Sequence, residues 1–88
     1  MNTPTANLPI KVLITDDHPV VRSGYRRMLE NEPDIRVVAE ANDGEDGIDM
    51  YKEYEPDVMI LDLSMPGIGG YEALRRIRAF DTEARILV

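Results

Sequence analysis

The sequence predicts an α/β fold with a parallel sheet, and two patterns carry this prediction. Short apolar runs rich in β-branched residues alternate along the chain with segments whose apolar residues recur at helical spacing. The runs are nearly continuous, as expected of strands that are covered on both faces. Strands separated by helices pair in parallel through right-handed crossovers. We therefore expect one domain with helices packed against its sheet.

The first half of the chain contains two predicted strands with a helix between them. Residues 10–15 form an apolar run that predicts the first strand. Pro19, a residue type favoured at the first position of a helix, opens a predicted helix that ends near Asn31. Residues 32–34 break the helical pattern, and residues 35–41 alternate in the manner of an edge strand.

The second half of the chain repeats this alternation. Residues 45–55 continue at helical spacing, and residues 58–61 predict a buried strand. A loop is expected over residues 63–70, followed by a helix over residues 71–80 and the start of a fourth strand over residues 84–88.

Composition restricts the classes of function. Ten basic and seventeen acidic residues give the 88-residue chain a net charge of −7, which disfavours nucleic-acid binding by these residues. The absence of cysteine removes disulfides and thiol chemistry and fits a cytoplasmic protein.

Residues 1–9 lack the regions of a signal peptide and are expected to form a flexible tail. The apolar runs are too short to cross a bilayer, so no membrane partner is expected.

Three aspartates follow the first and third predicted strands: Asp16, Asp17 and Asp62. Ligand sites of open parallel sheets lie at the carboxyl ends of the strands, so we expect the three carboxylates to converge. Two unit charges about 4 Å apart repel by about 4 kcal/mol at an effective dielectric constant of 20, which favours a bound cation or protons. Oxygen ligands favour Mg²⁺, beside which Asp62 could act as a nucleophile towards a phosphoryl group.

The chain resembles the receiver family of two-component response regulators, which has a flavodoxin-like fold, over residues 10–88. Four motifs carry the resemblance: the run Val12 to Pro19, Glu40-Ala41 with Gly44, the run Asp57 to Gly67, and the closing run Ala84 to Val88. The resemblance implies that Asp62 is the phosphoacceptor and that Asp17 and Asp62 are carboxylate ligands of Mg²⁺. It implies that Asp16 is an acid that supports these ligands and that the main-chain carbonyl of Ser64 completes the site.

The resemblance also implies partners and a biological role. The phosphoryl group would come from a sensor histidine kinase or a phosphotransfer protein, and the chain would catalyse its own modification without turnover of a diffusible substrate. The Asp-Asp-His-Pro start resembles receivers that precede a LuxR-type DNA-binding domain. This similarity implies a transcription regulator whose DNA-binding domain is absent from these 88 residues.

Two residues of a complete receiver, a hydroxyl residue after the fourth strand and a lysine after the fifth, would lie beyond Val88. We therefore expect residues 10–88 to be an incomplete receiver, with strand order 2-1-3-4 and without the last helix-strand-helix portion. Without the lysine, repulsion among the carboxylates would have to be relieved by the metal alone or by protonation, which would appear as raised carboxyl pKa values. The exposed sheet face, or the edge at residues 86–88, is expected to support a homo-oligomer.

Less specific interpretations apply to several residues. Each aspartate taken singly could be a turn or capping residue. His18 is interpreted as a helix-start residue rather than a metal ligand, and the Ser64 hydroxyl as incidental. Three glycines are interpreted as turn residues that supply positive φ values: Gly67, Gly69 and Gly70. Three arginines form either the solvated face of the first helix or part of a docking surface for the phosphodonor: Arg22, Arg26 and Arg27.

Two other functions remain open. A magnesium-dependent aspartyl phosphatase would need a second aspartate two residues after its nucleophile, where this chain has Ser64. The other alternative is a fragment that dimerises whatever its phosphorylation state.

Overall fold

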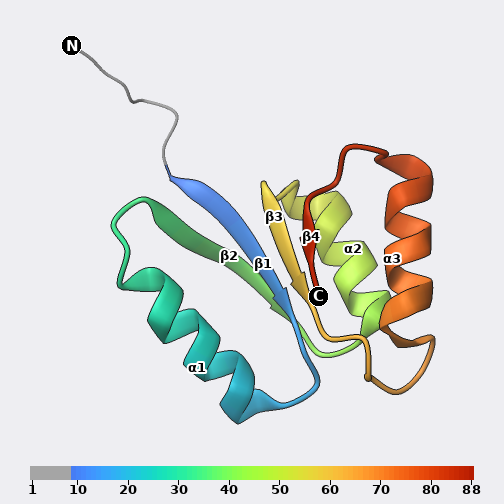
Figure 1. Ribbon diagram of the computed structural model, residues 1–88, viewed down its shortest axis with the longest axis horizontal. Helices are drawn as coiled ribbons and strands as arrows, with labels where there is room; N and C mark the ends of the chain where they lie inside the picture. Colours follow the sequence, from blue (N-terminus) through green and yellow to red (C-terminus); the bar gives the residue numbers. More distant parts are fainter. Residues whose placement is uncertain (1–8) are drawn as a thin grey trace.

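Residues 9–88, which the computed structural model describes, form a four-stranded parallel sheet with three helices (Figure 1). The elements in chain order are β1 (Ile10–Thr15), α1 (Pro19–Glu30), β2 (Ile35–Ala41), α2 (Gly44–Tyr54), β3 (Val58–Leu61), α3 (Gly69–Phe80) and β4 (Ile86–Leu87). The strand order β2-β1-β3-β4 confirms the predicted order. The predicted tail over residues 1–9 lies, except for Pro9, outside the described residues.

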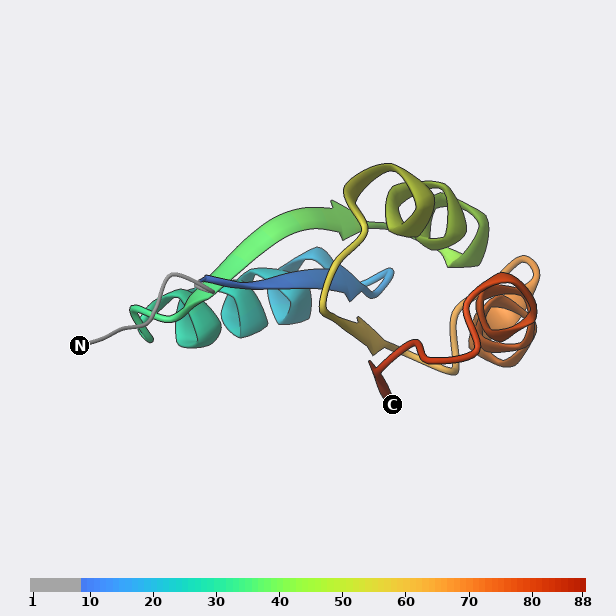
Figure 2. The same ribbon diagram turned by 90° about the horizontal axis from the view of Figure 1, so that it is seen from above.

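The sheet separates two apolar cores of unequal size. Helices α2 and α3 cover one face, where ten buried residues gather around Leu13, Met59 and Ile77. Helix α1 covers part of the opposite face, where the buried residues are Val12, Ile14 and Val37. Figure 2 shows α1 and α2 on opposite sides of β1 and β2. This distribution follows from right-handed crossovers and agrees with the expectation that one face is less covered.

Helix α1 contributes little to its core. It has no buried residue, and its apolar Val20 and Met28 are 85% and 60% exposed. Leu29 is the residue of α1 that packs against the smaller core. Of the helices in residues 9–88, none combines the length and the apolar character needed to cross a membrane.

Strand β2 contains an irregularity that its simple alternation did not predict. Val12 of β1 pairs with Val37, but Leu13 pairs with Ala39, so Val38 is an extra residue. Because a one-residue shift moves side chains to the opposite face, Val37 lies in the smaller core and Ala39 packs against the larger one. The same shift turns Glu40 to the α1 side of the sheet, in register with Ile14.

Helix α3 and strand β4 differ from their predicted bounds. Helix α3 begins at Gly69 rather than residue 71, and β4 is shorter than residues 84–88. Gly67 and Gly69 have positive φ, as predicted, but Gly70 does not, so its interpretation as a positive-φ turn residue was wrong. A Cβ atom on Gly70 would overlap the carbonyl oxygen of Asp62 and the Cα of Leu63, so glycine is needed there for close approach of the backbone.

Candidate functional site

The carboxyl ends of β1 and β3 bring the predicted aspartates together. Thr15 and Leu61 are the last paired residues of these strands, so Asp16 and Asp62 follow them side by side. The main-chain N–H of Asp62 donates to the carbonyl oxygen of Thr15 at 3.0 Å, and that of Asp16 donates to Ala41 at 3.1 Å. Main-chain hydrogen bonds to a neighbouring strand therefore fix the backbone position of each of these two aspartates.

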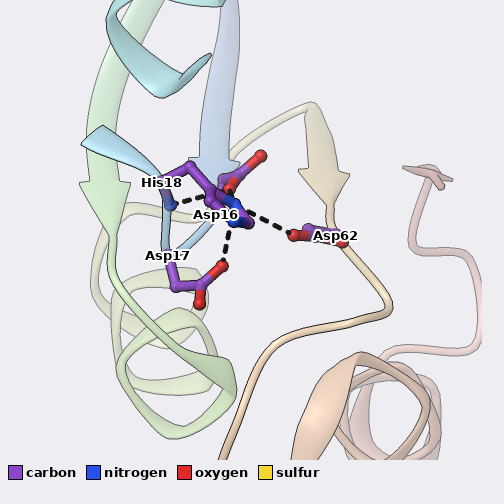
Figure 3. A group of neighbouring side chains, drawn as sticks. All are labelled: Asp16, Asp17, His18 and Asp62. Carbon is purple, nitrogen blue, oxygen red and sulfur yellow. Dashed lines mark hydrogen bonds and ion pairs between the residues drawn. The ribbon is translucent and has the colours of Figure 1, made fainter. Parts of the chain in front are cut away.

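Four side chains form an acidic group at this edge (Figure 3): Asp16, Asp17, His18 and Asp62. One ligand-type atom from each lies within 4.8 Å of the others. Asp16 is buried, whereas Asp17 and Asp62 are half-buried. The convergence expected from the ends of the two strands is therefore present.

His18 lies among the carboxylates, which the sequence did not indicate. It precedes α1 as predicted, but its side chain makes no capping hydrogen bond. Its Nδ1 lies 2.8 Å from Asp16 Oδ1, 3.0 Å from Asp17 Oδ1 and 3.8 Å from Asp62 Oδ2. The hydrogen bond with Asp16 and the charge of Asp17 raise the pKa of His18. Its imidazole can therefore offset part of the negative charge when protonated.

Ser64 makes two hydrogen bonds to one oxygen of Asp62. Its main-chain N–H and its hydroxyl donate to Asp62 Oδ1 at 3.0 and 2.8 Å. These bonds lower the pKa of Asp62, because both stabilise the ionised carboxylate. Of the two outcomes predicted without a lysine, a bound metal or raised carboxyl pKa values, the second is not found at Asp62. The interpretation of the Ser64 hydroxyl as incidental was wrong.

The donor set fits a hard divalent cation. Asp17 Oδ1 is buried and receives no hydrogen bond within the described residues, and its neighbour His18 Nδ1, 3.0 Å away, carries charge only when protonated. A buried carboxylate oxygen without a donor is costly unless a cation or a proton stabilises it. Carboxylate oxygens from Asp16, Asp17 and Asp62 are the ligand type that Mg²⁺ prefers.

Comparison with known proteins decides the family. Residues 12–88 match the family model described as the response regulator receiver domain. The chain belongs to the receiver family. Receivers of this family are signalling modules rather than turnover enzymes.

The curated relatives are longer than this receiver. The nitrate/nitrite response regulator protein NarL of Escherichia coli K12 is 42% identical over 80 residues, which cover 91% of this chain and 37% of that protein. The response regulator UvrY of the same strain is 46% identical over 79 residues, which cover 90% of this chain and 36% of that protein. The receiver chain thus spans a little over a third of the length of these relatives.

Solved structures show the same fold. A LuxR-family two-component response regulator from Aurantimonas sp. SI85-9A1 has a TM-score of 0.84 and 47% identity, over 89% of this chain and 56% of that one. The receiver domain of the putative response regulator NarL from Mycobacterium tuberculosis has a TM-score of 0.84 and 34% identity, over 90% of this chain and 64% of that one.

An arginine of α1 joins the receiver's site to β2. Arg22 Nη1 donates to the main-chain carbonyl oxygen of Asp16 at 2.7 Å, and its Nε donates to Glu40 Oε1 at 2.9 Å. Its side chain is only 15% exposed, so the interpretation as a solvated face was wrong for Arg22. Arg26 bonds Glu40 as well but is 47% exposed. The sequence did not predict these contacts, because they depend on which face Glu40 occupies.

A groove runs from the acidic group along the less covered sheet face. Its volume is about 640 Å³, and Asp16 and Asp62 lie among its lining residues. The apolar part of its lining includes Tyr25, Met28, Ile60, Leu87 and Val88. Charged groups and an open apolar surface are thus adjacent in this receiver chain.

Proposed function

We propose that Asp62 accepts a phosphoryl group from a phosphohistidine, with Mg²⁺ bound beside it. The observation that carries this proposal is the convergence of Asp16, Asp17 and Asp62 within the acidic group at the ends of β1 and β3. In a family of signalling modules, an ionised aspartate in such a group is suited to act as a covalent acceptor.

The environment of Asp62 supports its role as the nucleophile. Its lowered pKa keeps the carboxylate ionised at neutral pH. Ser64 donates to Oδ1, whereas Oδ2 lies 3.8 Å from His18 Nδ1. In the proposed reaction, an oxygen–phosphorus bond forms at Asp62 as the nitrogen–phosphorus bond of the phosphohistidine breaks. The electron pair of the broken bond stays on the histidine nitrogen, which takes up a proton from solvent, so that the donor is released as neutral imidazole.

We propose that Asp17 and Asp62 supply carboxylate ligands to Mg²⁺ and that the main-chain carbonyl of Ser64 supplies another. Asp16, which is buried, supports this set. Bound Mg²⁺ would neutralise charge on the phosphoryl oxygens. The buried Asp17 Oδ1 supports this assignment, because it receives no hydrogen bond within the described residues and its neighbour His18, 3.0 Å away, offsets its charge only when protonated.

The phosphodonor is proposed to be a sensor histidine kinase or a phosphotransfer protein in the cytoplasm. Exposed Arg27 on α1 is a candidate contact for it. A structure of the related RcsB from Salmonella enterica is described as bound to a promoter. We propose that a longer parent of this chain controls transcription through a separate DNA-binding domain, and that residues 9–88 themselves do not bind DNA.

An aspartyl phosphatase is the less favoured alternative. The position where it would need a second acid is occupied by Ser64, whose hydroxyl is a donor to Asp62. A hydroxyl cannot serve as a general acid or base as readily as a carboxyl group at neutral pH. We therefore expect a stoichiometric adduct rather than steady release of phosphate.

The intact mass of the chain after incubation with Mg²⁺ and acetyl phosphate tests the proposal. We expect one added phosphoryl group, and no addition when EDTA replaces Mg²⁺. Asp62→Asn keeps the side-chain shape but removes the nucleophilic carboxylate, so the adduct should disappear.

Asp49→Asn is the matched control, because Asp49 is an exposed acid on α2 outside the acidic group. It removes the same charge and should leave the adduct unchanged. An adduct that persists in Asp62→Asn would contradict the assignment of Asp62, and no adduct on a folded wild-type chain would contradict the proposed function.

A further inference from the structure

Arg22 connects α1 to the segment that follows β1 and to the end of β2. From α1, its guanidinium donates to the Asp16 carbonyl after β1, to Glu40 on β2, and to Asn42 Oδ1 after β2 at 3.0 Å. A guanidinium presents several donors in a fixed planar fork, so one side chain can hold several acceptors in a defined arrangement. The Asp16 carbonyl is thereby held relative to the edge of the sheet.

That carbonyl belongs to the peptide that joins Asp16 to Asp17. Rotation of this peptide would redirect the Asp17 side chain, whose buried Oδ1 receives no hydrogen bond within the described residues and lies 3.0 Å from His18 Nδ1. Because His18 follows Asp17 on the same backbone, the position of Asp17 Oδ1 still depends on how that backbone is held. Asp16 is held separately, since its own N–H bonds Ala41 and its carboxylate accepts from the N–H of His18 at 2.9 Å.

The irregularity in β2 makes this contact possible. Because Val38 is an extra residue, Glu40 shares a face with Ile14 and with α1, where Arg22 and Arg26 reach it. Without the irregularity, alternation would turn Glu40 towards α2 and away from both arginines. Glu40 therefore fixes the guanidinium of Arg22, which in turn contacts the Asp16 carbonyl.

We propose that Arg22 is a positioning residue, which holds the Asp16–Asp17 peptide in the orientation that allows Asp17 to bind a divalent cation. This inference rests on the proposed function, because it concerns the same cation. It assigns to α1 a direct part in the geometry of the site.

Charge and geometry predict opposite effects when Arg22 is replaced. Removing a positive charge beside an acidic group should, by Coulomb's law alone, tighten the binding of a cation. Loss of a residue that orients a metal ligand should weaken it, typically by tenfold or more. The sign of the change in Mg²⁺ affinity therefore separates a positioning role from a purely electrostatic one.

The test is calorimetric titration of the full chain with Mg²⁺ alone, for the wild type, Arg22→Gln and Arg26→Gln. Urea unfolding of each protein reports stability separately. Arg26→Gln is the matched control, because Arg26 shares Glu40 and the same charge but has no bond to Asp16. We expect Arg22→Gln to weaken Mg²⁺ binding about tenfold, and Arg26→Gln to change it by less than about twofold.

Equal affinities for the two variants, or tighter binding by Arg22→Gln, would overturn the inference. If Arg22→Gln does not fold, Arg22→Lys replaces it: the ammonium keeps the charge but cannot bridge Glu40 and Asp16 as the planar fork does. Wild-type affinity in Arg22→Lys would then overturn the positioning role, and weakened affinity would support it. A wild-type chain that binds no Mg²⁺ would instead contradict the proposed function on which the inference rests.

Discussion

At the scale of single residues, the ionisation of Asp62 is set by a residue two positions away. Ser64 donates from both its main-chain N–H and its hydroxyl to the same carboxylate oxygen. The main-chain bond depends on the loop conformation, whereas the hydroxyl bond depends on the side chain. The two contributions can therefore be separated by substitution.

Ser64→Ala removes the hydroxyl bond and should raise the pKa of Asp62 relative to the wild type, because the main-chain bond alone stabilises the ionised form less. Carbon-detected NMR titration of the Asp62 carboxyl group measures this pKa. Ser23→Ala, on the exposed surface of α1, is the control and should not change it. An unchanged Asp62 pKa in Ser64→Ala would show that the hydroxyl bond contributes nothing to ionisation.

Glu40 predicts a pH dependence of stability. Burial alone would raise its pKa, but hydrogen bonds from Arg26 and Arg22 hold the pKa below its ordinary value of 4.5. Its stabilising contribution is therefore present above about pH 4.5 and is lost as the pH falls through the lowered folded-state pKa. Glu40→Gln should cost about 1–2 kcal/mol of unfolding free energy at pH 7 and less in acid.

Urea unfolding between pH 7 and pH 3 measures this difference. The control is Glu53→Gln, because Glu53 is exposed on α2 and makes no ion pair among residues 9–88. An unfolding free energy that differs from the wild type by the same amount at pH 7 and pH 3 in Glu40→Gln would contradict the assigned role of Glu40.

At the scale of elements, local patterns predicted the strands but not how two of them align. The bounds of β1, β2 and β3 follow from short apolar runs and agree with the sequence prediction. The extra residue Val38 could not be predicted from alternation, because Val37, Val38 and Ala39 are all apolar and their order does not indicate which face of the sheet each one occupies. The site shows the same limit: Asp16 and Asp62 follow predictable strand ends, whereas the contacts of Arg22 depend on that alignment.

Glycines in two helices should respond oppositely to substitution. Gly70→Ala should destabilise the chain by about 1–3 kcal/mol, because the new Cβ would overlap the backbone of Asp62 and Leu63. Gly24 lies inside α1 with no atom within 4 Å of a new Cβ. Gly24→Ala should therefore stabilise the chain by about 0.5–1 kcal/mol through helix propensity.

Thermal and urea unfolding of both variants measure these changes. Gly70→Ala should also weaken phosphoryl addition, because the overlap involves the main chain of Asp62, the proposed phosphoacceptor. A Gly70→Ala protein as stable as Gly24→Ala would contradict the close packing of α3 against the loop after β3.

At the scale of the whole molecule, the 88-residue chain presents apolar surface that a second copy could cover. Met28 of α1 and Leu87 of β4 line the same groove and are 60% and 62% exposed. Strand β4 pairs only with β3 among residues 9–88, so its outer edge is available. Exposed apolar surface beside an open strand edge favours association between chains.

We expect light scattering at micromolar concentration to show a dimer or a higher oligomer. Combined Met28→Glu and Leu87→Glu should shift the chain towards a monomer, because association would bury the new charges. Tyr71→Glu, on an α3 residue that is 71% exposed and lies outside the groove, should leave association unchanged. A monodisperse wild-type monomer would contradict self-association.

The identity of the phosphorylated residue tests the central proposal most directly. After incubation with Mg²⁺ and acetyl phosphate, borohydride reduction converts an aspartyl phosphate to homoserine, and peptide mapping by mass spectrometry locates it. We expect homoserine at position 62 and nowhere else, and none when EDTA replaces Mg²⁺. Conversion at Asp16 or Asp17 with Asp62 unmodified would contradict the assignment of the phosphoacceptor.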